Sequence, residues 1–314
     1  MTTQYPKNFG AMLNAFFSGW KPNEECLDYQ HLGRKIDQET GKEVTVPGRW
    51  TPCRSITELI GISEAWPIYD SYTTAQRFTK WEVKAAKDGN TIPVESNHDT
   101  YRLDRVYSDS DPEEGRQDCL DDLPKYKRMQ DALEVNGKTP VWVICSGRGY
   151  HTYTYLERFI SAREGQQLQD ILGYVFDLQF DIWTRIVRAH MMRLPYSKNS
   201  RTNTWVLSVS RNMTLGGLRN AMKSELLDGC HWENPIRVPP EHILKLHPGT
   251  KVLEEFREKK REKARAKIRR GMEKKAREAK KLLDEGKSWP EIAKLMGYQN
   301  ERHLRYWTER FGSL

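Results

Sequence analysis

The feature that most constrains the fold is a highly charged stretch between residues 251 and 281. It contains fifteen Lys or Arg and six Glu, a balance of +9, and since the whole chain carries +8, all other residues together carry −1. The stretch lacks Pro, and Ala alternates there with Lys, Arg and Glu, which favours a long exposed helix. Its apolar residues are too few for a buried stripe. We therefore expect a main domain at 1–250, a basic helical linker at 251–278 and a small module at 279–314.

The same charge pattern indicates the kind of partner. Clustered Lys and Arg are typical of nucleic-acid binding, although a solvated helix of mixed charges has the same composition. No apolar run approaches the length of a membrane span, and the N-terminus has no signal-peptide pattern, so we expect no membrane partner. Five scattered cysteines indicate a reducing, cytoplasmic setting rather than a disulfide framework, and without a Cys-x-x-Cys pair no structural zinc site is predicted.

Residues 279–314 have the pattern of three short helices with a tight second turn. Ser288 and Glu291 have the capping-box form, the next apolar face is Ile292, Leu295 and Met296, and Gly297 can end that helix. The last helix, capped by Asn300, would turn Leu304, Trp307 and Phe311 inward. This predicts a helix-turn-helix whose outer face carries Arg302, Arg305, Tyr306 and Arg310. DNA binding by this basic face is favoured over a cap that only packs on the main domain.

The main domain alternates strand-like and helical patterns. Val141–Cys145 and His151–Tyr155 predict two strands of a hairpin around a glycine-rich turn, and Trp205–Val209 predicts another strand. Apolar residues at helical spacing predict a helix over Gln166–Leu178. Helices and strands mixed in this way indicate an α/β or α+β domain.

An acidic pair is the first candidate for chemistry. If Arg105–Asp111 is a strand, alternation places Asp109 and Asp111 on the same face, where two carboxylates can share a pair of divalent cations. The alternative is a solvated turn, because Pro112 follows directly.

The turn between the two hairpin strands is the second candidate. Its sequence is Ser-Gly-Arg-Gly-Tyr-His over residues 146–151. Glycines let backbone N–H groups face an anion, while Ser146, Arg148 and His151 offer side-chain donors, so phosphate binding is favoured over a plain turn.

A third candidate combines an acidic residue with a basic loop. Asp181, or the nearby Asp177, precedes Arg193-Leu-Pro and a stretch with several donors. Arg193, Lys198 and Arg201 could clamp a triphosphate, with hydroxyls from Ser200 and Thr202, or the stretch could be an ordinary surface loop.

Together these residues resemble the archaeo-eukaryotic primase superfamily, the group of the small catalytic primase subunit and of primase–polymerases on plasmids and viruses. The matches to its motifs, in chain order, are Asp109 and Asp111, then Ser146, Arg148 and His151, then Asp181, then Arg193-Leu-Pro195. The resemblance covers about Pro67 to Val209. The chain departs from the family where Asp104-Arg-Val-Tyr-Ser replaces an apolar strand, where the loop ends in Arg201-Thr-Asn203, and where a zinc-binding stem is not visible.

The resemblance implies an α/β catalytic domain with an RNA-recognition-motif-like sheet. It implies two-metal nucleotidyl transfer, with Mg²⁺ or Mn²⁺ held by Asp109, Asp111 and Asp181. It also implies that six residues bind the incoming nucleoside triphosphate: Ser146, Arg148, His151, Arg193, Lys198 and Arg201. The expected function is primer synthesis on single-stranded DNA in the replication of a mobile element, and a replicative helicase is a conceivable partner. The alternatives are a repair-type polymerase of the same superfamily and a non-catalytic replication initiator or DNA-binding regulator.

Overall fold

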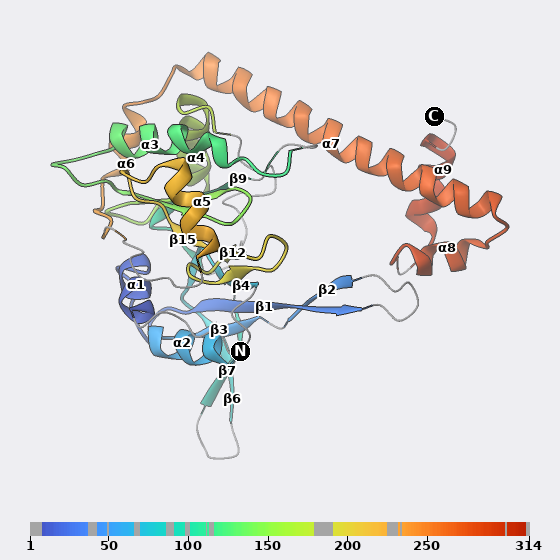
Figure 1. Cartoon of the computed structure of the whole chain (residues 1–314), viewed down its shortest axis with the longest axis horizontal. Coiled ribbons are helices and arrows are strands. Elements are labelled where there is room, and N and C mark those ends of the chain that lie inside the picture. Colours follow the sequence, from blue (N-terminus) through green and yellow to red (C-terminus); the bar gives the residue numbers. More distant parts are fainter. Residues whose placement is uncertain are drawn as a thin grey trace. The chain divides into compact units, whose positions relative to one another are not determined.

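The chain divides into two compact units. One comprises residues 1–35 and 44–253, and the other comprises residues 36–43 and 254–314. The computed structural model describes residues 8–36, 43–48, 50–65, 70–85, 91–97, 101–110, 112, 116–178, 191–224, 232, 234–298 and 300–311. Figure 1 shows the order of the elements along the chain.

A four-stranded antiparallel sheet is the centre of the first unit. Its order is β15-β10-β11-β9, and its strands are β9 (Arg105–Ser110), β10 (Val141–Cys145), β11 (Tyr150–Tyr155) and β15 (Leu207–Ser208). The β10–β11 hairpin confirms the predicted one, with β11 starting one residue earlier than expected. β9 confirms the predicted strand over Arg105–Ser110, and Asp111 lies outside the described residues.

The two faces of this sheet have different neighbours. On one face, the Phe16 ring of α1 (Phe9–Phe16) meets the rings of Trp142 and Tyr153 edge-on, at 5.4 and 4.7 Å between centroids. On the other, Tyr126 of α3 (Leu123–Ala132) contacts Tyr150 at 4.4 Å. Because side chains alternate along a strand, Asp109 and His151 share the face of Tyr153.

A second helix, α4 (Ala162–Val175), also packs against β9. It begins four residues before the predicted Gln166, because Ser161 and Glu164 form a capping box that provides partners for the first backbone N–H groups. The amide of Gln169 donates to the carbonyl of Tyr107 at 2.7 Å, which ties the helix to the strand that carries Asp109. The mixed helix and strand composition confirms the predicted α/β class.

A five-stranded sheet lies in the same unit. Its order is β12-β4-β1-β2, with β3 also paired to β1. Its strands are β1 (Leu27–Ile36), β2 (Glu43–Pro47), β3 (Thr51–Cys53), β4 (Ser71–Thr74) and β12 (Met191–Arg193). Pairing of β12 with β4 brings Arg193 opposite Tyr72.

Short ribbons and helices complete the unit. The ribbons pair β5 (Arg77–Phe78) with β8 (Tyr101–Arg102), β6 (Trp81–Ala85) with β7 (Thr91–Ser96), and β13 (Lys198–Asn199) with β14 (Thr204–Trp205). The remaining helical elements are α2 (Ile56–Glu64), a 3-10 turn at Leu120–Asp122, α5 (Leu215–Lys223) and α6 (Pro240–Leu244). The single strand predicted at Trp205–Val209 is wrong. The chain changes sheet at Val206, so β14 and β15 are separate.

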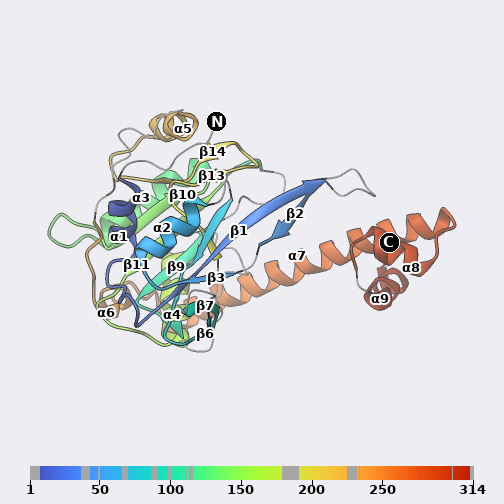
Figure 2. The same cartoon turned by 90° about the horizontal axis from the view of Figure 1, so that it is seen from below.

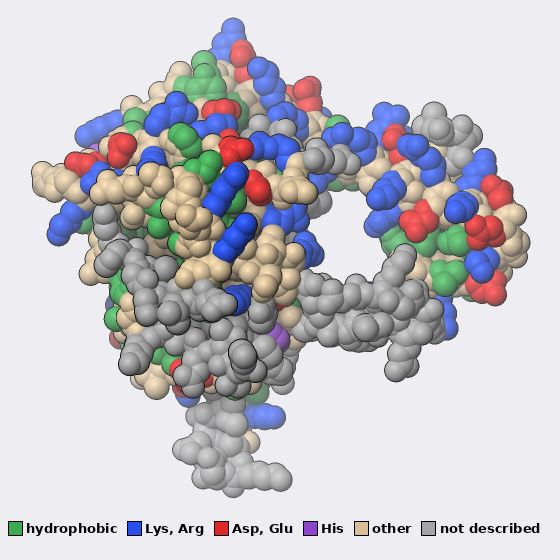
Figure 3. All heavy atoms as spheres, in the orientation of Figure 1, with side chains coloured by type: hydrophobic (Ala, Val, Ile, Leu, Met, Phe, Trp, Pro, Cys, Tyr) green, Lys and Arg blue, Asp and Glu red, His purple; other side chains and the backbone are tan. Residues whose placement is uncertain are grey.

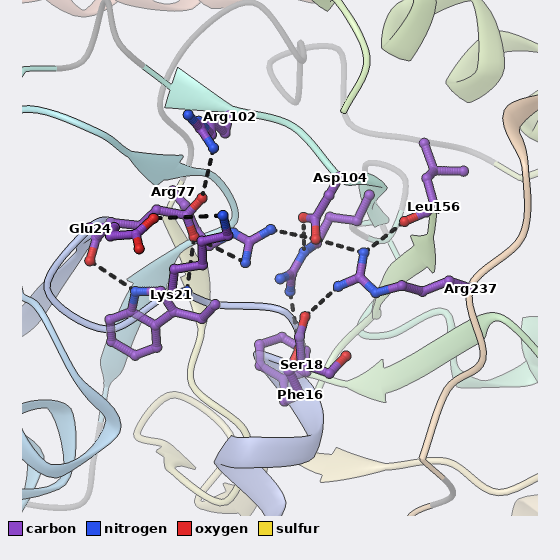
Figure 4. A network of polar contacts seen from close by, with 12 residues as sticks. Phe16, Ser18, Lys21, Glu24, Arg77, Arg102, Asp104, Leu156 and Arg237 are labelled. Atoms are coloured by element: carbon purple, nitrogen blue, oxygen red, sulfur yellow. Dashed lines mark hydrogen bonds and ion pairs between the residues drawn. The ribbon is translucent and has the colours of Figure 1, made fainter. Parts of the chain in front are cut away.

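Buried charges anchor the start of β9 (Figure 4). Asp104 forms ion pairs with three arginines: Arg77, Arg105 at 3.3 Å and Arg237 at 2.8 Å. The guanidinium of Arg105 donates to the carbonyl of Phe16 at 3.2 Å. Burial alone would raise the pKa of Asp104, but Arg105, Arg77 and Arg237 outweigh it and lower that pKa. The network therefore joins β9 to the end of α1 and to the segment of Arg237.

From residue 254 onward, the second unit consists of one long helix and two short ones. α7 (Thr250–Asp284) is continuous in both views (Figures 1 and 2), so the expected linker and the first helix of the expected module form one helix. It is followed by α8 (Trp289–Leu295) and α9 (Arg302–Phe311). The core between the three helices consists of Ala279, Ile292, Ala293 and Leu304, with Trp307 packed against it. Leu295 is 43% exposed, so its predicted place on the inner face is wrong.

Candidate active site

Two expected site residues face each other across neighbouring strands. The antiparallel register of β9 and β11 places Asp109 opposite His151, with 3.3 Å between Oδ1 and Nε2. His151 is buried, whereas 19% of the Asp109 side chain is exposed. The pair therefore presents a partly open carboxylate that is oriented by a buried imidazole.

One of the three predicted metal ligands, Asp109, lies within the described residues. Carboxylate oxygens are the ligands that Mg²⁺ and Mn²⁺ prefer, so Asp109 has suitable chemistry. Asp111 and Asp181, the other two predicted ligands, lie outside the described residues. Within the ranges that the structure describes, no three His, Cys, Asp or Glu side chains form a metal-binding group.

The β10–β11 turn is held tightly by its own backbone. Ser146 donates from both its N–H and its hydroxyl to the carbonyl of Gly149, at 2.9 and 3.2 Å. Gly149 passes so close to β9 that an added Cβ would lie 1.7 Å from the carbonyl oxygen of Ser110. Only glycine fits this position, because a contact of that length overlaps backbone atoms.

The expected convergence of three donors in this turn is not seen. The Nε of Arg148 donates to the carbonyl of Gln117 at 3.2 Å, and the Ser146 hydroxyl donates within the turn. Among the described residues, no hydrogen bond or ion pair joins either side chain to His151. The side chains of Ser146 and Arg148 therefore form hydrogen bonds that hold the turn and its neighbouring segment.

The basic loop lies against this turn. The side-chain amide of Asn199 donates to the carbonyl of Ser146 at 2.8 Å. A Cβ on Gly147, where φ is +102°, would lie 2.8 Å from the hydroxyls of both Thr202 and Thr204. The two stretches expected to bind phosphate are therefore neighbours in the fold.

Asp70 organises the other side of the basic loop. Its carboxylate accepts from the guanidinium of Arg193 at 2.7 Å and from the hydroxyl of Ser200. Burial alone would raise the pKa of Asp70, but Ser200 and Arg193 outweigh it and lower that pKa. The predicted clamp residue Arg193 is thus held by a carboxylate inside the protein.

Tyr72 contacts Arg193. The guanidinium of Arg193 lies 4.8 Å from the centre of its ring. Burial raises the pKa of Tyr72, and the charges of Arg193, Asp70, Arg201 and Asp109 act on the same phenol. Tyr72 therefore packs against Arg193 of the neighbouring strand β12.

The remaining two basic residues of the loop have different surroundings. The ammonium group of Lys198 lies 4.6 Å from the centre of the Trp205 ring. Arg201 is exposed, and its backbone N–H donates to the side-chain oxygen of Asn199 at 3.0 Å. Of the two, Arg201 has its charge at the surface.

Asp70, Tyr72 and Asn199 were not predicted from the sequence. Asp70 and Tyr72 are more than a hundred residues from Arg193, and nothing in their local sequence marks them. Asn199 stands inside the basic stretch and could have been noted there as a side chain able to bridge two loops.

The proposed DNA-facing residues lie in the second unit. Arg302, Arg305, Tyr306 and Arg310 are all exposed on α9, as predicted. The capping box of Ser288 and Glu291 is also present, and Gly297 follows α8 with φ of +74°. In the part of the chain that the structure describes, no helix has the length and apolar character needed to cross a bilayer.

Replacing His151 by Ala is expected to weaken binding of a nucleoside triphosphate about 10- to 100-fold while the fold stays intact. A hydrogen bond to a charged group contributes roughly 1.5–3 kcal/mol, which corresponds to that range. The measurement is calorimetric titration with a nonhydrolysable nucleotide. Thr152→Ala is the matched control, because Thr152 is the next residue of β11 on the opposite face. A His151 variant that melts much earlier yet binds nucleotide normally would show that this residue only packs the sheet.

No protein-family model matches the sequence, and no curated protein matches it. The primase–polymerase AEP domain of cyanophage S-2L is 11% identical, with a TM-score of 0.42 over 78% of this chain and 99% of that one. The polymerase domain of Mycobacterium tuberculosis Ligase D is 16% identical, with a TM-score of 0.39 over 76% and 85%. The catalytic domain of primase RepB' is 16% identical, with a TM-score of 0.35 over 65% and 83%.

These solved structures are a primase–polymerase AEP domain, a polymerase domain and a primase catalytic domain. Every TM-score is below 0.5, so the similarity by itself says nothing about the activity of this chain. A proposal for the function of this chain therefore rests on the residues of its candidate site.

Proposed function

We propose that the chain is a primase that synthesises primers on a DNA template by two-metal nucleotidyl transfer. The observation that supports this most is the pairing of Asp109 with His151 on one sheet, beside two adjoining loops rich in phosphate donors. In this proposal Asp109 is one of the acidic metal ligands and the two loops carry the cationic phosphate ligands, the two kinds of group that nucleotide polymerisation requires.

The three acidic residues Asp109, Asp111 and Asp181 would hold Mg²⁺ or Mn²⁺. When bound, two such ions lower the pKa of an attacking 3′-hydroxyl and neutralise charge on the triphosphate and the leaving pyrophosphate. The protein supplies no nucleophile of its own in this proposal. Its side chains bind and orient the two substrates.

The phosphates would be held by residues from both loops. His151 and Arg193 are positioned by carboxylates, and Arg201 has its charge at the surface. Lys198, Ser146 and Arg148 stand in the same two loops, and we assign them to the triphosphate as well. In this proposal Arg193 exchanges its contact with Asp70 for one with a phosphate when nucleotide binds.

Incorporation of α-labelled nucleotides tests this function on two templates, single-stranded DNA without a primer and the same DNA with an annealed primer. A primase makes product on single-stranded DNA with no primer supplied. A repair-type polymerase of the same superfamily extends only a supplied primer, and a non-catalytic initiator or regulator makes product on neither. Product on the unprimed template is the expected result.

Removing residues 251–314 is expected to lower de novo initiation more steeply than extension of an annealed primer. All the motifs lie before Val209, so a fragment of residues 1–250 keeps the nucleotide site but loses the +9 stretch. Initiation has no primer duplex to help hold the template and therefore depends more on additional DNA binding. The slope of log affinity against log salt is expected to become shallower by about 0.9 for each duplex phosphate, or about 0.7 for each single-strand phosphate, that the fragment no longer binds.

The two rates are compared at saturating nucleotide for the fragment and the full chain. Equal loss of both reactions in a well-folded fragment would contradict the proposed role of the C-terminal helices. An insoluble or wholly inert fragment would indicate instead that these helices serve to hold the main domain together.

A further inference from the structure

The exposed face of α9 has a mixed polar composition. Arg302, Arg305, Tyr306 and Glu309 follow the spacing i, i+3, i+4 and i+7, and all four are exposed. Residues at this spacing lie on one side of a helix. The opposite side is buried through Leu304 and Phe311. The helix therefore shows one continuous polar face to solvent.

This face is held rigidly by the packing behind it. Leu304 is fully buried in the core of the second unit, and burying such a side chain contributes about 1.5–3 kcal/mol. The side chain of Asn300 accepts from the N–H of Arg302 at 3.2 Å, and Glu301 pairs with Arg305 at 3.3 Å. A helix fixed in this way can present its side chains in a set geometry.

Aromatic stacking on single-stranded bases is disfavoured on this surface. Every aromatic ring between residues 279 and 311 already has a cation or an imidazole of the same unit beside it. The pairs are Trp289 with Arg305, Tyr298 with Lys275, Tyr306 and Phe311 with Arg310, and Trp307 with both Lys275 and His303. Proteins that hold single strands expose aromatic rings as platforms for bases. Here the rings orient cations instead.

The face of α9 has the size and chemistry to enter a DNA major groove. A helix with its side chains is about 10–12 Å across, and the major groove is about 12 Å wide. Arg302 and Arg305 can donate to guanine, and the Glu309 carboxylate can accept from the amino group of cytosine. Glu309 thus gives this face an acceptor in addition to its cationic donors.

The middle of α7 offers contacts to the DNA backbone. Between Lys263 and Met272 the helix has five Lys or Arg and no acidic residue. These residues are exposed or partly exposed, and Figure 3 shows Lys and Arg side chains along this helix and the two that follow. Phosphate contacts of this kind set position and affinity without reading sequence.

We infer that α9 is a recognition helix for double-stranded DNA, which gives the chain a duplex-binding site distinct from its single-stranded template. Two features favour a duplex over a single strand: the face combines base-edge donors with the Glu309 acceptor, and each aromatic ring of the module already contacts a cation or an imidazole. This site would bring the protein to a particular duplex sequence. Duplex recognition by α9 does not depend on the proposed nucleotidyl transfer.

Selection from a duplex library with about twenty randomised base pairs, roughly two turns of DNA, tests the inference with the full chain. The wild-type chain is expected to enrich one sequence and to bind it at least about tenfold more tightly than either of its single strands. Arg302→Gln with Arg305→Gln is expected to weaken binding of that duplex about 10- to 100-fold, because base contacts are removed. Gln keeps the helix propensity, and circular dichroism checks that the fold is retained.

Lys280→Gln with Lys287→Gln is the matched control, since it removes the same charge from α7 and the turn after it. An equal loss of affinity in this control would overturn the inference, because the effect would then be one of net charge. Binding of single strands as tight as binding of the duplex, or the absence of any enriched sequence, would overturn it too. A chain that incorporates no nucleotide yet selects a duplex sequence would contradict the proposed primase and leave duplex recognition standing.

Discussion

Replacing Asp109 and Asp111 together by Ala is expected to reduce nucleotide incorporation by at least about 1,000-fold while DNA binding largely survives. Each tenfold loss of rate corresponds to about 1.4 kcal/mol, and losing the metal ligands removes several kcal/mol of transition-state stabilisation. The reason that binding survives is that these side chains are assigned to the metal and not to the template. Incorporation on a primed template and fluorescence anisotropy with labelled DNA measure the two effects.

Asp121→Ala with Asp131→Ala is the matched control, because it removes two exposed carboxylates that pair with surface arginines of the same unit. The control is expected to retain nearly full activity. Substantial polymerisation by the Asp109 and Asp111 double variant would show that the site has been assigned wrongly.

Asp104→Asn is expected to have the largest effect on stability, lowering the free energy of unfolding by about 3–5 kcal/mol. The carboxylate is 6% exposed and faces three arginines, two of which are almost fully buried. Removing one partner of a buried ion pair leaves uncompensated charge in a region of low dielectric. Urea unfolding followed by tryptophan fluorescence gives the difference, with Asp121→Asn as an exposed control. A decrease below about 1 kcal/mol would show that the network is not an anchor of β9.

The same carboxylate predicts a dependence of stability on pH. Its pKa in the folded chain is lowered, so its contribution is fully present above the ordinary Asp value of about 3.9 and is lost as the pH falls through the folded pKa. Wild-type stability should therefore drop in acid below about pH 4, and the Asp104→Asn variant should show a smaller drop. Unfolding curves at several pH values compare the two proteins.

Local signals predicted the elements better than their connections. The β10–β11 hairpin and the capping box of α8 follow from nearby residues, and both are present. The separation of β14 from β15 at Val206 was not predictable, because it depends on which distant strands each one meets. The continuity of α7 was open to prediction, because no Pro or Gly stands between residue 278 and Leu283, and the expected boundary at 278 was placed on composition alone.

The same distinction holds for the candidate site, where positions along one strand were predictable and contacts between distant segments were not. Alternation along two strands could place Asp109 and His151 on faces of a sheet, but their opposition depends on the register between strands far apart in sequence. The contact of Arg193 with Asp70 spans more than a hundred residues, so no local pattern could reveal it. For Asp111 and Asp181 the structural positions are outside the described residues, and their roles remain predictions.

The central claim, that the chain starts primers, is tested most directly by the fate of a γ-phosphate. A circular single-stranded template without primer is supplied with nucleotide labelled on the γ-phosphate. Each extension step releases that phosphate with pyrophosphate, whereas the first nucleotide of a new chain keeps it. The account predicts short labelled products from the wild-type chain and none from the Asp109 and Asp111 double variant. Products labelled only when α-labelled nucleotide and a primer are supplied would contradict it.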